Sequence, residues 1–248
     1  MLDLVQLVST AAFIVSGSAV GIRLLLLAWR TRELTDFTIA CALVVLAGIT
    51  YPLMLAGALG GFALEPTRWM LIASGFTGAL GFGAVAAFTQ RAFRPHAAWA
   101  HALSGVLIAM LGYSAVASML SAQHAGDFEA LRSPRSPLVW TRVAAVAIYL
   151  WTSFEGLRCW VQARRRLALG LADPLVVNRF LLWALIGAFA LCSVAPALVL
   201  TLAGKQPLDY PMTRLTTGVA GVATAVAMQL SFLPPASYRR WVLGHATA

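Results

Sequence analysis

The stretch RRRLALGLADPLVVNRFLLW, residues 164–183, decides how this chain folds. Three consecutive arginines lead through a short turn to Asp173 and Pro174, and an apolar run follows. Aspartate directly before proline is a strong helix-start signal. The carboxylate accepts hydrogen bonds from free backbone N–H groups in the first turn, and proline at the first helical position loses no needed donor. We predict that a helix begins here and that the arginines close the preceding helix at a membrane surface.

The composition extends this interpretation to the whole chain. Of the 248 residues, 60% are hydrophobic and only 11% are charged. A soluble domain of this size has too much surface to hide that amount of apolar side chain. Apolar tracts of roughly 20 residues recur along the sequence, and each can cross a hydrocarbon layer of about 30 Å as a helix. Since lipid offers no partners for unpaired backbone groups, we expect an all-α, polytopic integral membrane protein.

The apolar tracts, separated by charged, proline and glycine residues, predict a seven-transmembrane-helix bundle that forms one membrane domain, 1–248. The predicted spans are about 4–28, 37–60, 68–91, 98–121, 138–162, 175–203 and 211–234. The first tract lacks the basic amino-terminal region of a signal peptide, and Asp3 is its only early charge. We therefore expect it to remain as a permanent span.

The basic residues predict an orientation, because Lys and Arg are retained in cytoplasmic connections. Of the eighteen basic residues, twelve fall on one side of the alternating connections: Arg23, Arg30, Arg32, Arg91, Arg94, Arg158, Arg164, Arg165, Arg166, Arg179, Arg239 and Arg240. The other side keeps Arg68, Arg132, Arg135, Arg142, Lys205 and Arg214. We expect this multi-pass chain to lie in the cell (inner) membrane with the N-terminus outside and the C-terminus cytoplasmic.

The same basic side bears on partners and source. Cations retained there also meet anionic lipid head groups, which explains the net charge of +9. Nucleic acid is therefore not an expected partner. The preference for arginine and alanine over lysine indicates a GC-rich bacterial genome.

Small residues recur every four positions in the third tract, at Gly75, Ala79, Gly83 and Ala87. Such stripes let helix backbones approach closely in lipid. We expect the third span to be central and Gly83 to lie in a close buried contact.

Two prolines predict a pocket near the outer side. Pro52 in the second span and Pro196 in the sixth each remove a backbone donor and tend to bend the helix, and bends splay helices apart. The side chains expected around this ligand-binding cavity are Tyr51, Arg68, Trp69, Thr77, Arg142, Tyr149, Asp209, Tyr210 and Arg214. The three arginines among them begin their spans on the outer side. They either anchor helices at the interface or together receive an anionic small molecule or lipid.

A second polar group is predicted near the inner side. Asn178 lies about one turn inside the sixth span and is too short to reach the head groups, so it needs a partner on another helix. Glu155 and Arg158 are three residues apart and share a helix face, where the acid requires a cation. The predicted inner polar network comprises Arg23, Gln90, Glu155, Arg158, Asn178, Arg179 and Gln229. It either holds helices together or acts as a conformational or proton-linked switch.

The sequence carries no motif for catalysis or for a cofactor. The four histidines fall in connections or at span ends, without the pattern of a metal or haem site. The cysteines Cys41, Cys159 and Cys192 lack metal-ligand spacing, and no phosphate-binding loop occurs. We expect no metal, no cofactor and no enzymatic activity.

The predicted layout, seven spans with an outer N-terminus, resembles that of rhodopsins and seven-helix receptors. The likeness is one of architecture, and the only lysine, Lys205, falls in an outer connection rather than where retinal would bind. The favoured function is a sensory or receptor-like module with an outward-facing ligand pocket and a basic cytoplasmic face that engages a signalling partner. The alternatives are a small-molecule transporter or channel subunit, or a non-catalytic assembly subunit of a membrane complex.

Overall fold

The computed structural model describes residues 2–59, 61–127 and 136–245, and all regular structure in these ranges is helical. The long helices are α1 (Leu2–Thr31), α4 (Leu64–Phe93), α5 (Ala98–Gln123), α7 (Leu138–Leu167), α8 (Pro174–Leu202) and α9 (Pro211–Phe232). The shorter elements are α2 (Leu34–Val45), the π-helix η1 (Leu46–Thr50), α3 (Tyr51–Leu59), the 3-10 helix η2 (Pro207–Asp209) and α10 (Ala236–His245).

The helix start predicted at residues 173–174 is confirmed. Asp173 Oδ1 accepts a hydrogen bond from the backbone N–H of Leu175 at 2.7 Å, and Pro174 is the first residue of α8. The three arginines occupy the last turn of α7, as predicted. Gly170 completes the intervening turn with a φ of 70°, a conformation that side chains with a Cβ disfavour.

Six helical segments are long and apolar enough to cross a membrane. They are Leu7–Thr31, Leu34–Gly57, Leu64–Phe93, Ala98–Gln123, Pro174–Leu202 and Pro211–Phe232. α7 is as long as α4 but more polar along its length, and it is not among the six. The described chain is thus all-helical, with the composition of a multi-pass membrane protein.

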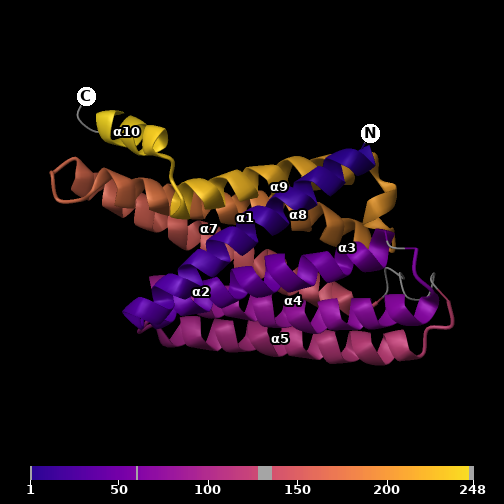
Figure 1. Cartoon of the computed structure of the whole chain (residues 1–248). Helices are drawn as coiled ribbons and strands as arrows, with labels where there is room; N and C mark the ends of the chain where they lie inside the picture. Colours follow the sequence, from indigo (N-terminus) through magenta and orange to yellow (C-terminus); the bar gives the residue numbers. More distant parts are fainter. Residues whose placement is uncertain (1, 60, 128–135, 246–248) are drawn as a thin grey trace.

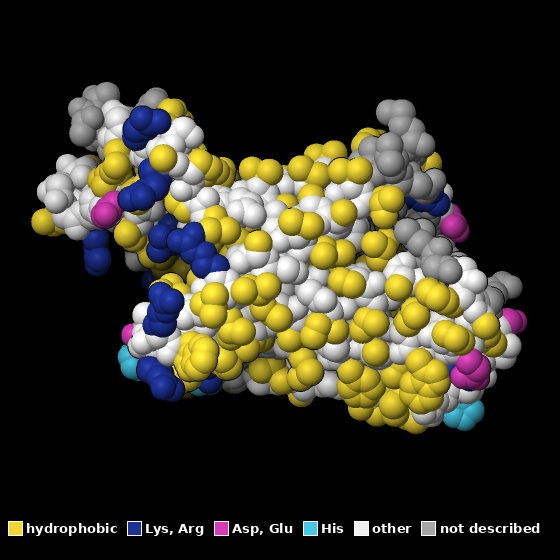
Figure 2. All heavy atoms as spheres, viewed as in Figure 1, with side chains coloured by type: hydrophobic (Ala, Val, Ile, Leu, Met, Phe, Trp, Pro, Cys, Tyr) yellow, Lys and Arg dark blue, Asp and Glu magenta, His cyan; other side chains and the backbone are white. Residues whose placement is uncertain are grey.

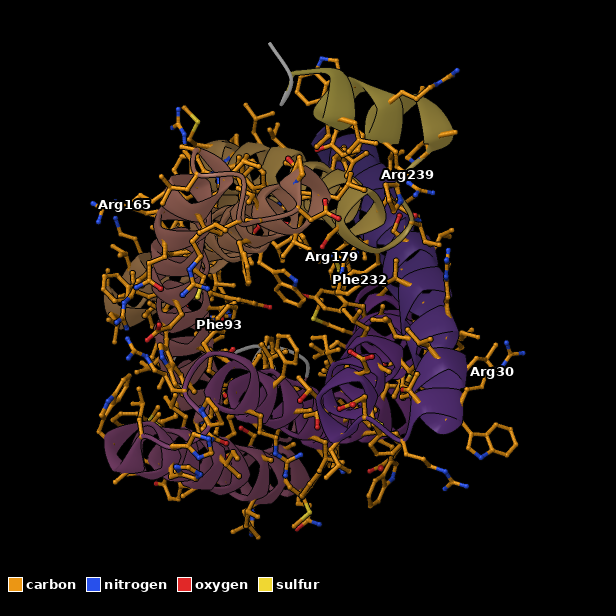
Figure 3. All side chains as sticks on the ribbon, turned by 90° about the vertical axis from the view of Figure 1, so that its left-hand side faces the viewer. Arg30, Phe93, Arg165, Arg179, Phe232 and Arg239 are labelled. Carbon is orange, nitrogen blue, oxygen red and sulfur yellow. The ribbon has the colours of Figure 1, made fainter. Side chains whose placement is uncertain are left out.

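Successive helices run back and forth along the bundle, with α2 and α3 together forming one pass between α1 and α4 (Figure 1), and seen end-on they form a ring (Figure 3). Going round the ring, α1 contacts α2, α2 contacts α4, α4 contacts both α5 and α7, α7 contacts α8, α8 contacts α9, and α9 returns to α1. α10 lies beyond the end of α9, at the end of the bundle that faces the viewer in Figure 3.

Basic side chains gather at the end of the bundle where α10 lies, whereas apolar side chains cover its middle (Figure 2). We call this the arginine-rich end. α1, α4, α7 and α9 finish there, and its basic residues include Arg30, Arg91, Arg94, Arg164, Arg165, Arg166, Arg239 and Arg240.

The predicted second span is one long helix with a π-helical turn that ends at Thr50, two residues before Pro52. Proline has no N–H to donate to the preceding turn, and a local widening of the helix redistributes the freed backbone groups. Thr50 Oγ1 lies 3.1 Å from the carbonyl oxygen of Val45 and 3.0 Å from Thr77 Oγ1 on α4. The helix distortion predicted at Pro52 is therefore a π-turn, and the hydrogen bond from Thr50 to Thr77 joins it to α4.

The closest helix contacts differ from the predicted stripe. Gly83 is buried, but a Cβ there would meet Ile108 at an ordinary 3.5 Å, and Gly75 has no neighbour within 4 Å. The close approach on α4 is instead at Gly81. The tightest backbone contact joins α7 to α8, where a Cβ on Gly156 would lie 2.8 Å from a backbone nitrogen. The four-residue spacing identified the small residues, and Gly83 among them is buried against α5, but the spacing did not identify the closest contact on α4, which is at Gly81.

Candidate functional site

A buried carboxylate lies near the arginine-rich end. Glu155 on α7 is only 2% exposed, and its Oε1 accepts a hydrogen bond from Arg94 Nε at 2.7 Å. Arg94 directly follows the last residue of α4, and its guanidinium also lies over the ring of Trp99, 5.6 Å from the centroid. Arg158 approaches the other carboxylate oxygen at 3.7 Å. Two cations thus offset the loss of hydration that burial imposes on this acid.

Neutral polar pairs extend this cluster across three helices. Thr89 Oγ1 on α4 and Thr152 Oγ1 on α7 lie 2.9 Å apart and are fully buried. Gln90 Nε2 lies 3.0 Å from Nε2 of His101 on α5. The other ring nitrogen of His101 is 3.0 Å from the carbonyl oxygen of Ala97. A neutral imidazole that donates from Nδ1 and accepts at Nε2 satisfies both contacts, so the cluster joins α4, α5 and α7 through directed hydrogen bonds.

The remaining members of the predicted inner network lie elsewhere. Asn178 exchanges hydrogen bonds with the hydroxyl of Tyr238 on α10, at 2.9 Å and 3.3 Å, rather than with Glu155. Arg23 and Arg179 are exposed, and Gln229 is partly buried on α9. The predicted network is therefore divided into an α4–α5–α7 cluster and a separate α8–α10 contact.

Sequence reasoning missed Arg94, His101 and Tyr238. Arg94 lies in the short connection between α4 and α5, and His101 lies in the first turns of α5. The available signal was position: Arg94 lies one turn beyond Gln90, which was already a candidate. Tyr238 lies after the last predicted span, where no inward-facing side chain was expected.

The predicted outer pocket also separates into several contacts. Arg68 Nη1 pairs with Glu65 at 2.5 Å, and Arg68 Nη2 donates to the carbonyl oxygen of Ala125 at 2.7 Å. Arg142 donates to Thr201 and so joins α7 to α8. Among the described residues these two arginines share no partner, so each fits the anchoring alternative.

The other outer candidates lie near the ends of helices. Trp69 is 58% exposed. The ammonium of Lys205 lies over the ring of Tyr210, with Nζ 5.5 Å from the ring centroid. Asp209 is exposed in η2, and Arg214 lies in the first turn of α9.

Three of the predicted pocket residues lie inside the bundle. Tyr51 packs against Phe13 of α1 at 4.8 Å between ring centroids, and Tyr149 of α7 packs edge-on against Phe82 of α4 at 6.0 Å. Phe13, Tyr51 and Phe82 pack against the same buried core. Thr77, bonded to Thr50, holds the π-turn next to Tyr51. Residues from four helices therefore form one aromatic layer, which we call the tyrosine layer.

The two tyrosines are unusual because neither hydroxyl has a hydrogen-bond partner among the residues that the structure describes. Both tyrosines are partly buried residues of the bundle. A phenol in an apolar interior normally finds a partner. The tyrosine layer thus presents two hydroxyls that can each donate and accept a further hydrogen bond.

A second aromatic layer lies nearer the arginine-rich end. Trp183 of α8 stacks on Phe88 of α4 at 4.8 Å and meets Phe232 of α9 edge-on at 5.4 Å. Phe88 is six residues closer to that end than Phe82, about 9 Å along the helix. In Figure 3, Phe93, Arg179 and Phe232 surround the centre of the bundle at this end. The second layer therefore lies between the tyrosine layer and the arginine-rich end.

Within residues 2–59, 61–127 and 136–245, no group of three His, Cys, Asp or Glu side chains is placed to hold a metal ion. A comparison of the chain with known proteins found no matching family, curated protein or solved structure.

Proposed function

We propose that the chain is a non-enzymatic sensory or receptor-like module of the cell (inner) membrane. In this proposal α7 crosses the membrane as the fifth of seven spans, the N-terminus is outside and the arginine-rich end is cytoplasmic. A small molecule binds at the tyrosine layer, and a signalling protein reads the cytoplasmic face.

The distribution of side chains around α7 supports a membrane-spanning role. Its polar residues Thr152 and Glu155 are buried against neighbouring helices. The opposite face exposes an apolar stripe at helical spacing, formed by Leu150, Phe154, Leu157 and Val161 with exposures of 57%, 61%, 48% and 39%. A soluble helix has the reverse arrangement. A helix that is polar inside and apolar outside suits lipid, although its average hydropathy is low.

The observation that carries the receptor proposal is the pair of unpartnered phenols at Tyr51 and Tyr149. They come from helices on different sides of the ring, so one ligand that bonds both would bridge α3 and α7. The π-turn directly before Tyr51 adds support, because such turns are frequent at functional sites. The hydroxyls can each donate and accept, and the flanking Phe13 and Phe82 favour a flat apolar body. The class proposed is therefore a small aromatic or unsaturated compound with polar ends, including an anionic one.

Ligand screening tests this proposal. We would record melting temperatures of the detergent-solubilised protein with a panel of aromatic acids, other anionic metabolites and lipids. A ligand of the tyrosine layer should raise the melting temperature, and Tyr51→Phe or Tyr149→Phe should abolish that rise. Tyr113→Phe is the matched control, because Tyr113 is 62% exposed on α5. A rise that survives both interior substitutions would place the ligand elsewhere and refute the proposed site.

Cysteine labelling tests the orientation. In a background without Cys41, Cys159 and Cys192, a cysteine at Arg165 should react only from the cytoplasmic side, and one at Lys205 only from the outside. If both react from the same side, α8 does not cross the membrane and the seven-span arrangement is wrong.

Transport is the second candidate, and Glu155 is the observation that favours it. A buried ionisable residue in a membrane bundle is a common feature of ion pathways. Solute or proton flux in proteoliposomes that disappears with Glu155→Gln, in a variant that still melts normally, would favour transport over sensing.

A further inference from the structure

An open groove lies on the surface of α7 near its carboxyl end. Its volume is about 340 Å³, and it is lined by Trp160, Val161, Arg164, Arg165 and Ala168. The guanidinium of Arg164 lies over the ring of Trp160, 5.4 Å from the centroid. The lining of the groove therefore combines the guanidinium groups of Arg164 and Arg165 with the ring of Trp160 and the apolar side chains of Val161 and Ala168.

The charge of the groove is not neutralised by the acids nearest in the chain. Glu155 is buried and held by Arg94 and Arg158. Asp173 caps the first turn of α8. Arginine side chains in this setting are well suited to phosphate, because the planar guanidinium donates two parallel hydrogen bonds.

The groove continues the apolar stripe of α7. At 100° per residue, the stripe that runs from Leu150 to Val161 and the groove residues Arg164, Arg165 and Ala168 lie on one face of the helix. A molecule with a phosphate at the arginines and hydrocarbon chains along the stripe would match this face over its whole length. A free phosphate compound would use only the arginines.

The depth of the groove fits the same occupant. α4 ends beside Glu155, and Trp160 lies about 7.5 Å further along α7, with Arg164 another 6 Å beyond. The polar layer of a bilayer adds roughly 5 to 8 Å on each side of the hydrocarbon. With the edge of the hydrocarbon placed at the end of α4, Trp160 lies in the outer part of the head-group layer, where tryptophan is enriched, and Arg164 reaches back to the phosphates along its flexible side chain.

We propose that this groove binds the phosphate head group of one anionic phospholipid, held by Arg164 and Arg165 and packed on Trp160. The inference rests on α7 being a membrane span, but not on any ligand at the tyrosine layer. It gives the arginine-rich end a specific lipid site in addition to its general attraction for anionic membranes.

The test uses the full chain in detergent micelles. Phosphatidylglycerol is titrated against phosphatidylcholine with the same acyl chains, and bound lipid is counted by native mass spectrometry. We expect one phosphatidylglycerol to be retained at concentrations where phosphatidylcholine is lost. Arg164→Gln with Arg165→Gln should weaken that binding roughly 30-fold, from a factor of about 5 for each cation near an anionic head group.

The matched control removes the same charge at the same end, by Arg239→Gln with Arg240→Gln on α10. It should leave the retained lipid in place. Equal loss in both double variants would show general electrostatic attraction and overturn the specific site. Inorganic phosphate that displaces the lipid at similar concentrations would show that the chains contribute nothing and would also overturn it.

The cysteine-labelling experiment separates this inference from the proposed function. For this purpose a further cysteine is placed at Leu138, the first residue of α7. If it reacts only from the outside while one at Arg165 reacts only from the cytoplasmic side, α7 crosses the membrane, and failure to retain lipid then removes the lipid site alone. If labelling itself fails, the membrane arrangement is wrong and both proposals fall with it.

Discussion

The two members of the Glu155–Arg94 pair should contribute very unequally to stability. Arg94→Met removes the cation but keeps most of the apolar side chain above Trp99. It leaves Glu155, 2% exposed, with Arg158 at 3.7 Å as its remaining charged partner. Stranding a buried charge typically costs about 3 to 5 kcal/mol. Because Arg158 compensates in part, we expect Arg94→Met to lower the free energy of unfolding by about 3 kcal/mol.

Glu155→Gln should cost much less. The arginine that it leaves behind is 26% exposed, so its guanidinium can reach water or head groups while it stays over Trp99. The amide oxygen of the new glutamine can still accept a hydrogen bond from Arg94 Nε. A hydrogen bond to a charged acceptor thus becomes one to a neutral acceptor, which should lower the free energy of unfolding by about 1 kcal/mol. The larger effect thus belongs to the residue that is less buried.

Unfolding by sodium dodecyl sulfate in mixed micelles measures both free energies on the same scale. Arg158→Met is the control. The Arg158 side chain is 43% exposed and its Nη1 lies 3.7 Å from Glu155 Oε2, beyond hydrogen-bond distance, so its loss should change the free energy of unfolding by less than about 1 kcal/mol. A loss for Glu155→Gln equal to or greater than that for Arg94→Met would refute the reasoning, because it would mean that the arginine, not the carboxylate, is the group that cannot be hydrated.

Three further predictions concern the helix contacts. Gly156→Leu should lower stability by about 2 kcal/mol, because its Cβ would lie 2.8 Å from the backbone of α8. Gly75→Leu, with nothing within 4 Å, should leave the melting temperature nearly unchanged. Tyr238→Phe removes the bond to Asn178 and should raise hydrogen exchange of the α10 amides alone; unchanged exchange would show that α10 is held by other contacts. Thr50→Val should cost about 1 kcal/mol in the same unfolding assay, and no loss would mean that the π-turn does not depend on the hydroxyl.

The helical architecture could be predicted because its signals are local. Asp173 and Pro174 specify where α8 begins whatever the rest of the chain does, and apolar length specifies the long helices. The π-turn at residues 46–50 was not predicted. Pro52 indicates that the helix must deform, but the form of the deformation depends on Thr77, a residue of another helix.

The candidate sites were predicted less well because they depend on pairing between helices. Glu155 could be recognised as a residue that needs a partner, because a charged carboxylate in lipid is energetically costly. Its main partner, Arg94, could not be identified because several arginines lie at similar depth. The same limit applies to Asn178, whose need for a partner was predicted correctly but whose partner, Tyr238, lies on α10. Sequence shows which polar groups need partners; the ring order of the helices decides which partners they meet.

α7 connects the features on which the proposals rest. Tyr149, Glu155 and Arg164 follow one another along a single unbroken helix, about 22 Å from first to last at 1.5 Å per residue. Because α7 packs most tightly on α8, at Gly156, a displacement of α7 at the tyrosine layer would be shared with α8 and with the turn between them. A ligand that draws Tyr149 toward Tyr51 would therefore move the arginines at the far end of the same helix. Under the proposed function, this makes the α7–α8 turn the part of the cytoplasmic face that a signalling partner would have to contact.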